Sequence, residues 1–75
     1  MDALRTVFAS VLGVPAAEIT PELSPQNTPA WDSLNAIVLI TEIEAAFGIR
    51  FSYDEAMAVK NFGDAEELVK RKLAV

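Results

Sequence analysis

The chain has 75 residues, and we assign all of them, 1–75, to one domain. A domain this small buries only about 60 to 65% of its unfolded surface, which favours a small module over an enzyme with a deep cleft. Eleven Asp and Glu against six Lys and Arg give a net charge of −5, which argues against nucleic acid as a partner.

The sequence contains no His and no Cys, which excludes a Ser-His-Asp triad, a Cys-His pair and zinc sites of the ordinary kinds. It also lacks a Gly-rich phosphate loop and the spacing of a calcium loop, so we expect no metal and no enzymatic activity. No signal peptide opens the chain, and no apolar run approaches the roughly 20 residues of a membrane span. We therefore expect a cytoplasmic protein without membrane contact.

Residues 2–12 carry apolar side chains at helical spacing, which predicts an amphipathic helix ending at Gly13: Leu4, Val7, Phe8, Val11 and Leu12. Residues 13–31 contain all four prolines and therefore form a long loop. Thr20-Pro21 and Ser24-Pro25 each indicate the start of a short turn. We expect three apolar side chains to hold the loop on the core: Val14, Ile19 and Leu23.

The central helix is predicted to start at the capping residues Asp32 and Ser33 and to run without Gly or Pro to Phe47, followed by Gly48 as C-cap. One apolar arc should face the core: Ala36, Leu39, Ile40, Ile43 and Phe47. A second apolar strip lies nearly opposite: Leu34, Ile37, Val38 and Ala45. A helix that is apolar on two sides is either buried all round or keeps one side for a partner.

After Gly48, Ile49 and Phe51 should return to the core. Ser52 and Glu55 form a capping box that predicts a short helix through about Ala58. Asp64 and Glu67 repeat this device for a last helix whose apolar stripe is Ala65, Leu68, Val69 and Leu73, with Lys70, Arg71 and Lys72 at its end. The prediction is an all-α four-helix bundle with a long first loop and a short third helix.

Ser33 falls in the first turn of the central helix, where free backbone N–H groups and the helix dipole favour a negative group such as a phosphate ester. An isolated Asp-Ser-Leu indicates no more than a helix cap worth about 1 kcal/mol. The extended pattern is more specific, because Asp32-Ser33-Leu34 is followed at fixed spacings by Ile37, Leu39, Ile43, Glu44, Phe47 and Phe51. This short acidic chain resembles an acyl carrier protein over essentially its whole length.

The resemblance implies that Ser33 carries a 4′-phosphopantetheine arm, which a phosphopantetheinyl transferase moves from coenzyme A, and that Asp32 caps the helix beside it. The arm would hold acyl or aminoacyl groups as thioesters and present them to loading and synthase enzymes of fatty acid, polyketide or nonribosomal peptide synthesis. The chain begins with Met and ends shortly after the last helix, which favours a freestanding carrier. We expect it to be a monomer.

The predicted partner surface combines an apolar strip with nearby acids: Leu34, Ile37, Val38, Glu42, Asp54 and Glu55. Two features depart from the family pattern. Ala30 stands at the usual glycine, and Asn35 and Val38 stand where the family commonly has acids. The contact beside the arm should therefore depend more on apolar burial than on charge.

Two other functions are alternatives to that of a carrier. An unmodified helical interaction module would use the same apolar strip to bind a partner helix. An enzyme with a Ser33-Lys dyad is disfavoured, because Lys60, Lys70 and Lys72 lie beyond the central helix.

Overall fold

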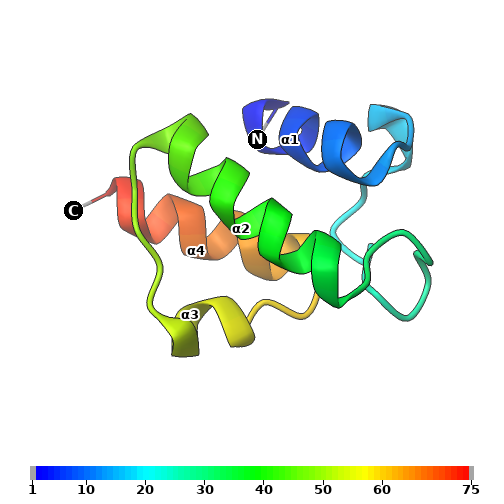
Figure 1. The fold of residues 1–75 in the computed structure, drawn as a ribbon. Helices are drawn as coiled ribbons and strands as arrows, with labels where there is room; N and C mark the ends of the chain where they lie inside the picture. The colour runs from blue at the N-terminus through cyan, green and yellow to red at the C-terminus, as the bar shows by residue number, and fades with distance from the viewer. Residues whose placement is uncertain (1, 75) are drawn as a thin grey trace.

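The computed structural model describes residues 2–74, and every regular element within them is helical. Four α-helices and one short 3₁₀ helix follow each other in the order α1 (Asp2–Leu12), η1 (Ala16–Glu18), α2 (Ser33–Phe47), α3 (Tyr53–Met57) and α4 (Phe62–Leu73) (Figure 1). The predicted four helices, the short third helix and the long first loop are confirmed. The 3₁₀ turn η1 was not predicted. No helix in this part of the chain combines the length and apolar character needed to cross a bilayer.

One core unites α1, α2, α4 and the loop between α1 and α2. Phe8 lies at its centre and is 1% exposed. Its ring meets Trp31 edge-on at 5.2 Å and Phe62 edge-on at 4.9 Å, arrangements that stabilise aromatic pairs beyond their buried area. The other buried side chains include Leu4, Leu12, Ile19, Leu39, Ile43, Ala65 and Val69. Trp31 and Phe62 were not among the predicted core residues.

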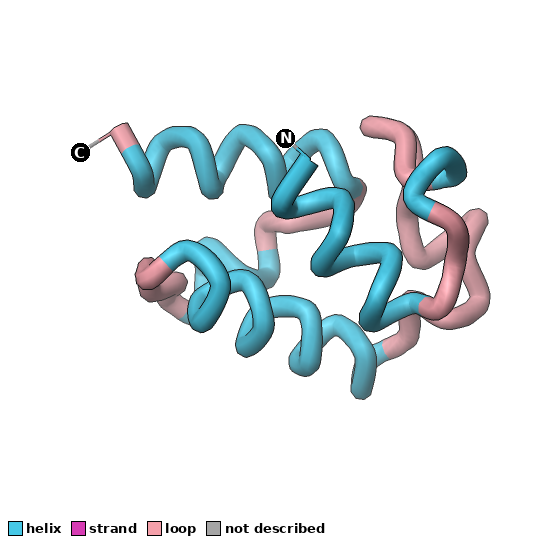
Figure 2. Tube along the Cα trace, turned by 90° about the horizontal axis from the view of Figure 1, so that it is seen from above, coloured by secondary structure: helices cyan, strands magenta, loops and turns pink. Residues whose placement is uncertain are grey.

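The long loop gathers at one end of the molecule, as Figure 2 shows, and is ordered by its own turns. The Leu23 N–H donates to Thr20 O and the Asn27 N–H to Ser24 O, so both predicted turns are present. Two loop carbonyls also reach the first turn of α4. Leu23 O accepts from Phe62 N at 2.9 Å, and Pro21 O accepts from Gly63 N at 3.0 Å. The loop therefore satisfies N–H groups that every helix leaves unpaired at its start.

The start of α4 differs from the prediction. We expected Asp64 to begin the helix, whereas the N-cap is Asn61, whose Oδ1 accepts from the Asp64 N–H at 2.7 Å. Asp64 is the third helical residue and accepts from Lys60 N through Oδ2. The prediction was wrong because the first turn contains Gly63, a poor helix former, and the loop carbonyls that stabilise this turn come from far earlier in the sequence.

The predicted arc of α2 faces the core. Leu39 and Ile43 are buried, and Ala36, Ile40 and Phe47 are half-buried. The helix ends at Gly48, whose φ of +66° lies in the left-handed region that favours glycine. The Ser52–Glu55 capping box of α3 is also present.

Candidate functional site

Ser33 is the first residue of α2, and two neighbours fix the chain before it. Trp31 is 5% exposed and anchors the end of the loop in the core. Asp32 is the extended N-cap, and its Oδ1 accepts from the Asn35 N–H at 2.9 Å. The predicted roles of Asp32 as helix cap and of Ser33 as a first-turn residue are thus both present. The chain therefore passes from the buried Trp31 to the capped start of α2, where Ser33 is exposed.

The hydroxyl of Ser33 is exposed and has no hydrogen-bond partner within residues 2–74. By contrast, the Ser52 hydroxyl at the start of α3 accepts from the Glu55 N–H and completes a cap. In the first turn of α2, Asp32 accepts from the N–H groups of Asn35 and Ala36. The N–H groups of the first two helical residues remain at the positive end of the helix dipole, a setting that stabilises a phosphate ester.

An apolar patch lies beside Ser33 and spans two helices. Its α2 members are Leu34 at 70% exposed, Ile37 at 66% and Val38 at 37%. Its α3 members are Tyr53 at 76% and Met57 at 60%. The strip on α2 was predicted and is exposed, so it is not buried inside the domain.

A groove between α2 and α3 joins Ser33 to part of this patch. It has a volume of about 450 Å³ and is lined by Ser33, Ala36, Ile37, Ile40, Thr41, Tyr53, Ala56 and Met57. The sequence analysis missed Tyr53 and Met57. Their i, i+4 spacing places them on one face of α3, but the sequence alone does not show that this face lies beside Ile37. The exposed serine, the free N–H groups and the groove fit a phosphodiester with an extended arm.

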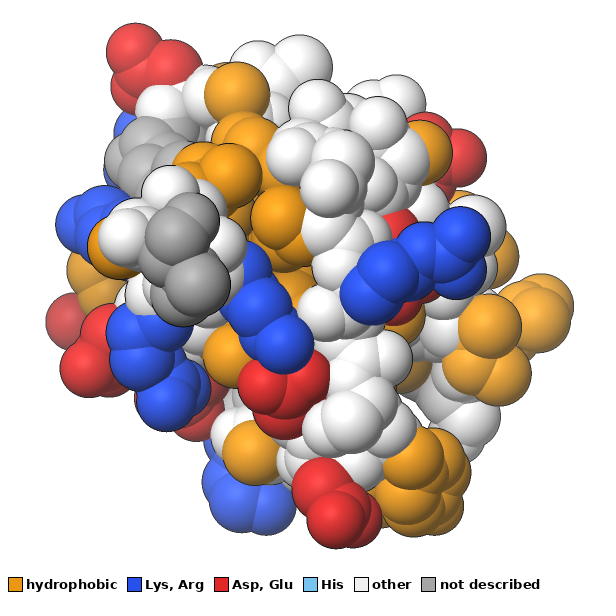
Figure 3. All heavy atoms as spheres, turned by 90° about the vertical axis from the view of Figure 1, so that its left-hand side faces the viewer, with side chains coloured by type: hydrophobic (Ala, Val, Ile, Leu, Met, Phe, Trp, Pro, Cys, Tyr) orange, Lys and Arg blue, Asp and Glu red, His pale blue; other side chains and the backbone are white. Residues whose placement is uncertain are grey.

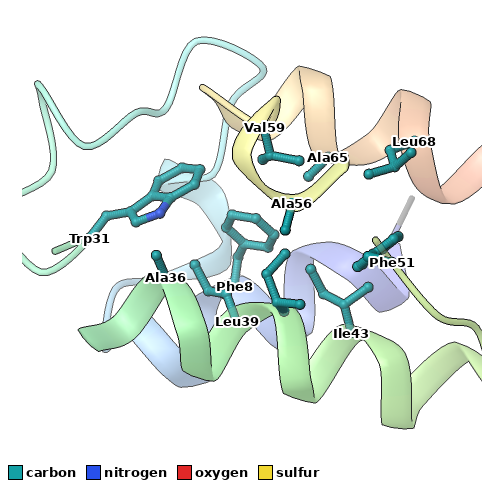
Figure 4. Close-up of a pocket in the computed structure, with 11 residues that line it drawn as sticks. Phe8, Trp31, Ala36, Leu39, Ile43, Phe51, Ala56, Val59, Ala65 and Leu68 are labelled. Atoms are coloured by element: carbon teal, nitrogen blue, oxygen red, sulfur yellow. The ribbon is translucent and has the colours of Figure 1, made fainter. Parts of the chain in front are cut away.

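The interior offers much less room than this groove. A cavity of about 40 Å³ lies between α2, α3 and α4, with Leu39, Ile43 and Ala56 among its lining side chains (Figure 4). Its volume is less than a tenth of that of the groove beside Ser33. The chain in this conformation therefore has space for an apolar arm or cargo on its surface rather than in its core.

Two acids on α2 and α3 are held by partners in the chain. Glu44 accepts from the Phe51 N–H at 2.8 Å. Glu55 Oε1 lies 2.8 Å from Lys72 Nζ and also accepts from the Ser52 N–H. The Lys72 ammonium, and secondly the Ser52 N–H, hold the pKa of the Glu55 carboxyl below its usual range.

Of the three acids in the predicted partner surface, Glu42 and Asp54 are exposed, whereas Glu55 has this structural role. A cluster of three basic side chains lies at the other end of the molecule. The last turn of α4 contains Lys70, Arg71 and Lys72, and Figure 3 shows the Lys and Arg side chains of this end. Ser33, at the start of α2, lies at the opposite end (Figure 1). The basic cluster of α4 therefore lies away from the serine, beside which the carboxylate of Asp32 is exposed.

Comparison with known proteins agrees with this geometry. The family described as "Phosphopantetheine attachment site" matches residues 2–69. A solution NMR structure of holo acyl carrier protein from Geobacter metallireducens superposes with a TM-score of 0.87 at 38% sequence identity, covering 97% of this chain and 84% of that one. The chain therefore belongs to the phosphopantetheine attachment family of acyl carrier proteins, which are carriers and not enzymes, and its cofactor is 4′-phosphopantetheine.

Proposed function

We propose that Ser33 is the attachment site and that this chain carries acyl or aminoacyl intermediates as thioesters. The observation that carries the proposal is the exposed hydroxyl of Ser33 at the capped start of α2, which has no hydrogen-bond partner among residues 2–74. The other serine at the start of an α-helix, Ser52, uses its hydroxyl as a cap. The arm's terminal thiol supplies the acyl-bearing group that this cysteine-free chain lacks.

The Ser33 hydroxyl has the chemistry that the loading reaction needs. Its Oγ would form the new bond to the phosphorus of coenzyme A that bears the pantetheine group. The bond from that phosphorus to adenosine 3′,5′-bisphosphate would break, and the hydroxyl proton would pass to a base of the phosphopantetheinyl transferase. The chain offers no His or Cys to act as this base.

The partners in this proposal are the transferase and the loading and synthase enzymes that use the loaded arm. They would dock on the apolar patch, because Leu34, Ile37, Val38, Tyr53 and Met57 surround the serine and are all exposed. Glu42 and Asp54 would contribute at its border. An unmodified interaction module would use the same patch, but membership of a phosphopantetheine-carrying family favours the carrier.

The test is intact-mass measurement of the apo protein after incubation with coenzyme A and a broad-specificity phosphopantetheinyl transferase. Wild type and Ser52→Ala should gain one phosphopantetheine, and Ser33→Ala should gain none. Ser33→Ala should keep its fold, because Asp32 still caps α2. Mass gain by Ser33→Ala would refute the attachment site. No gain by the folded wild type would favour the unmodified module.

A further inference from the structure

Asn35 makes two hydrogen bonds that reach back across Ser33. Its backbone N–H donates to Asp32 Oδ1 at 2.9 Å, which is ordinary N-capping. Its side-chain Nδ2 donates to the carbonyl oxygen of Ala30 at 2.7 Å, at the short end of the range for such bonds. The two bonds close a loop of residues 30–35 in which Ser33 lies. Asn35 is therefore bonded both to the cap residue, Asp32, and to Ala30, two positions before it.

The bond to Ala30 adds to an anchor on the other side of the same segment. Trp31 donates its N–H to Thr28 O and has its indole buried against Phe8. The segment between the core and α2 is thus held by the buried ring of Trp31 and by the Asn35 side-chain amide. With both in place, the backbone that leads into the exposed serine has little freedom to move.

Only a donor at residue 35 can make the bond to a carbonyl oxygen. A carboxylate accepts hydrogen bonds and would repel the Ala30 oxygen across the same short distance. The uncharged amide at this position therefore has a specific task in the chain. Where the family commonly has an acid, this chain has an amide whose hydrogen bond to Ala30 orders the segment before the serine.

We infer that Asn35 is a positioning residue for the modification of Ser33: its side-chain amide holds residues 30–32 so that the backbone of Ser33 is presented in one orientation. This inference rests on the proposed attachment site. A nucleophile that is held in its reactive orientation reacts faster than one that must find it, and the gain appears in the rate of the chemical step. Loss of the amide should lower kcat for loading more than it raises KM.

The experiment measures kcat and KM of a broad-specificity phosphopantetheinyl transferase, with coenzyme A saturating and the concentration of apo carrier varied. Asn35→Asp removes the donor and keeps the shape, and an acid in the first turn favours the helix, so this variant should stay folded. Asn35→Ala removes the donor without adding charge. Both variants should lower kcat by roughly three- to tenfold, the range that one net hydrogen bond supports. Because only the Asp variant adds charge, a fall in kcat shared by both cannot come from charge.

Asn27→Asp is the matched control. The Asn27 side chain also donates to a backbone carbonyl, that of Glu22 at 3.0 Å, in the exposed part of the same loop. Its replacement should leave kcat within twofold of wild type. Unchanged kcat in both Asn35 variants, or an equal loss in Asn27→Asp, would overturn the positioning role while Ser33 remained the attachment site. Loading that persisted in Ser33→Ala would instead overturn the attachment site and this inference with it.

Discussion

The contact between this carrier and its partners should depend on apolar area more than on charge, and Ile37 provides the sharpest test. Its side chain is 66% exposed. Full burial of such a side chain is worth about 1.5 to 3 kcal/mol, so burying the exposed two-thirds should contribute roughly 1 to 2 kcal/mol. An exposed ion pair made by Glu42 contributes about 0 to 1 kcal/mol and weakens with salt.

The assay is steady-state loading by a broad-specificity phosphopantetheinyl transferase, with kcat/KM measured at low and at physiological salt. Ile37→Ala should lower kcat/KM by roughly five- to tenfold, since alanine retains only a small part of the buried area. Glu42→Gln should change it by less than about threefold. Leu73→Ala is the control, because Leu73 is also a large exposed aliphatic residue but lies at the C-terminal end of α4, outside the patch.

The reverse ranking would refute this reasoning. If Glu42→Gln and salt caused the large losses while Ile37→Ala was harmless, acids would direct docking. The structure also sets the order within the patch. Val38 is only 37% exposed, so it has about half the area of Ile37 left to bury, and Val38→Ala should cost less than Ile37→Ala.

Two further predictions concern stability. Phe8→Ala should lower the free energy of unfolding by about 3 to 5 kcal/mol, much of the roughly 4 to 11 kcal/mol expected for 75 residues, and a urea midpoint near that of wild type would contradict the central place of Phe8 in the core. Glu55→Gln should lower the melting temperature slightly at neutral pH. Folding lowers the pKa of Glu55. The contribution of the Glu55 carboxylate to stability is therefore fully present above the pKa of the unfolded chain, and it is lost as the pH falls through the lower pKa of the folded chain. The gap between the two proteins should therefore close in acid, and a gap that persisted there would count against the Lys72 contact.

The elements that the sequence predicted well are those specified by neighbours in the chain. Asp32 caps α2 by accepting a hydrogen bond from the N–H of Asn35, only three residues away. Glycine, found here at position 48, is one of few residue types that tolerate the left-handed conformation that ends α2. The start of α4 was misplaced because its stability depends on Leu23 and Pro21, about forty residues earlier. A local pattern contains no information about which distant carbonyl will face a helix end.

The candidate site likewise combines features that the local sequence specifies with features that depend on distant residues. The position of Ser33 and the apolar strip of α2 follow from helical periodicity, which a sequence displays directly. Tyr53 and Met57 join the patch only because α3 lies against α2, and α3 is itself held to α4 by the Glu55–Lys72 contact. The bond from Asn35 to Ala30 depends on a side-chain direction that residue spacing does not determine.

With docking on the apolar patch, as proposed, the net charge of −5 should be a poor guide to how this carrier recognises partners. Around the serine, Asn35 uses a neutral amide to fix the loop, and Val38 adds apolar area. Glu44 holds the chain after α2 through Phe51, so its carboxylate is directed inward. The remaining acids can still attract a basic partner from a distance, which raises the rate of encounter. If partners dock on the apolar patch as proposed, the shape of the partner's recess, more than its charge, should decide which enzymes use the arm.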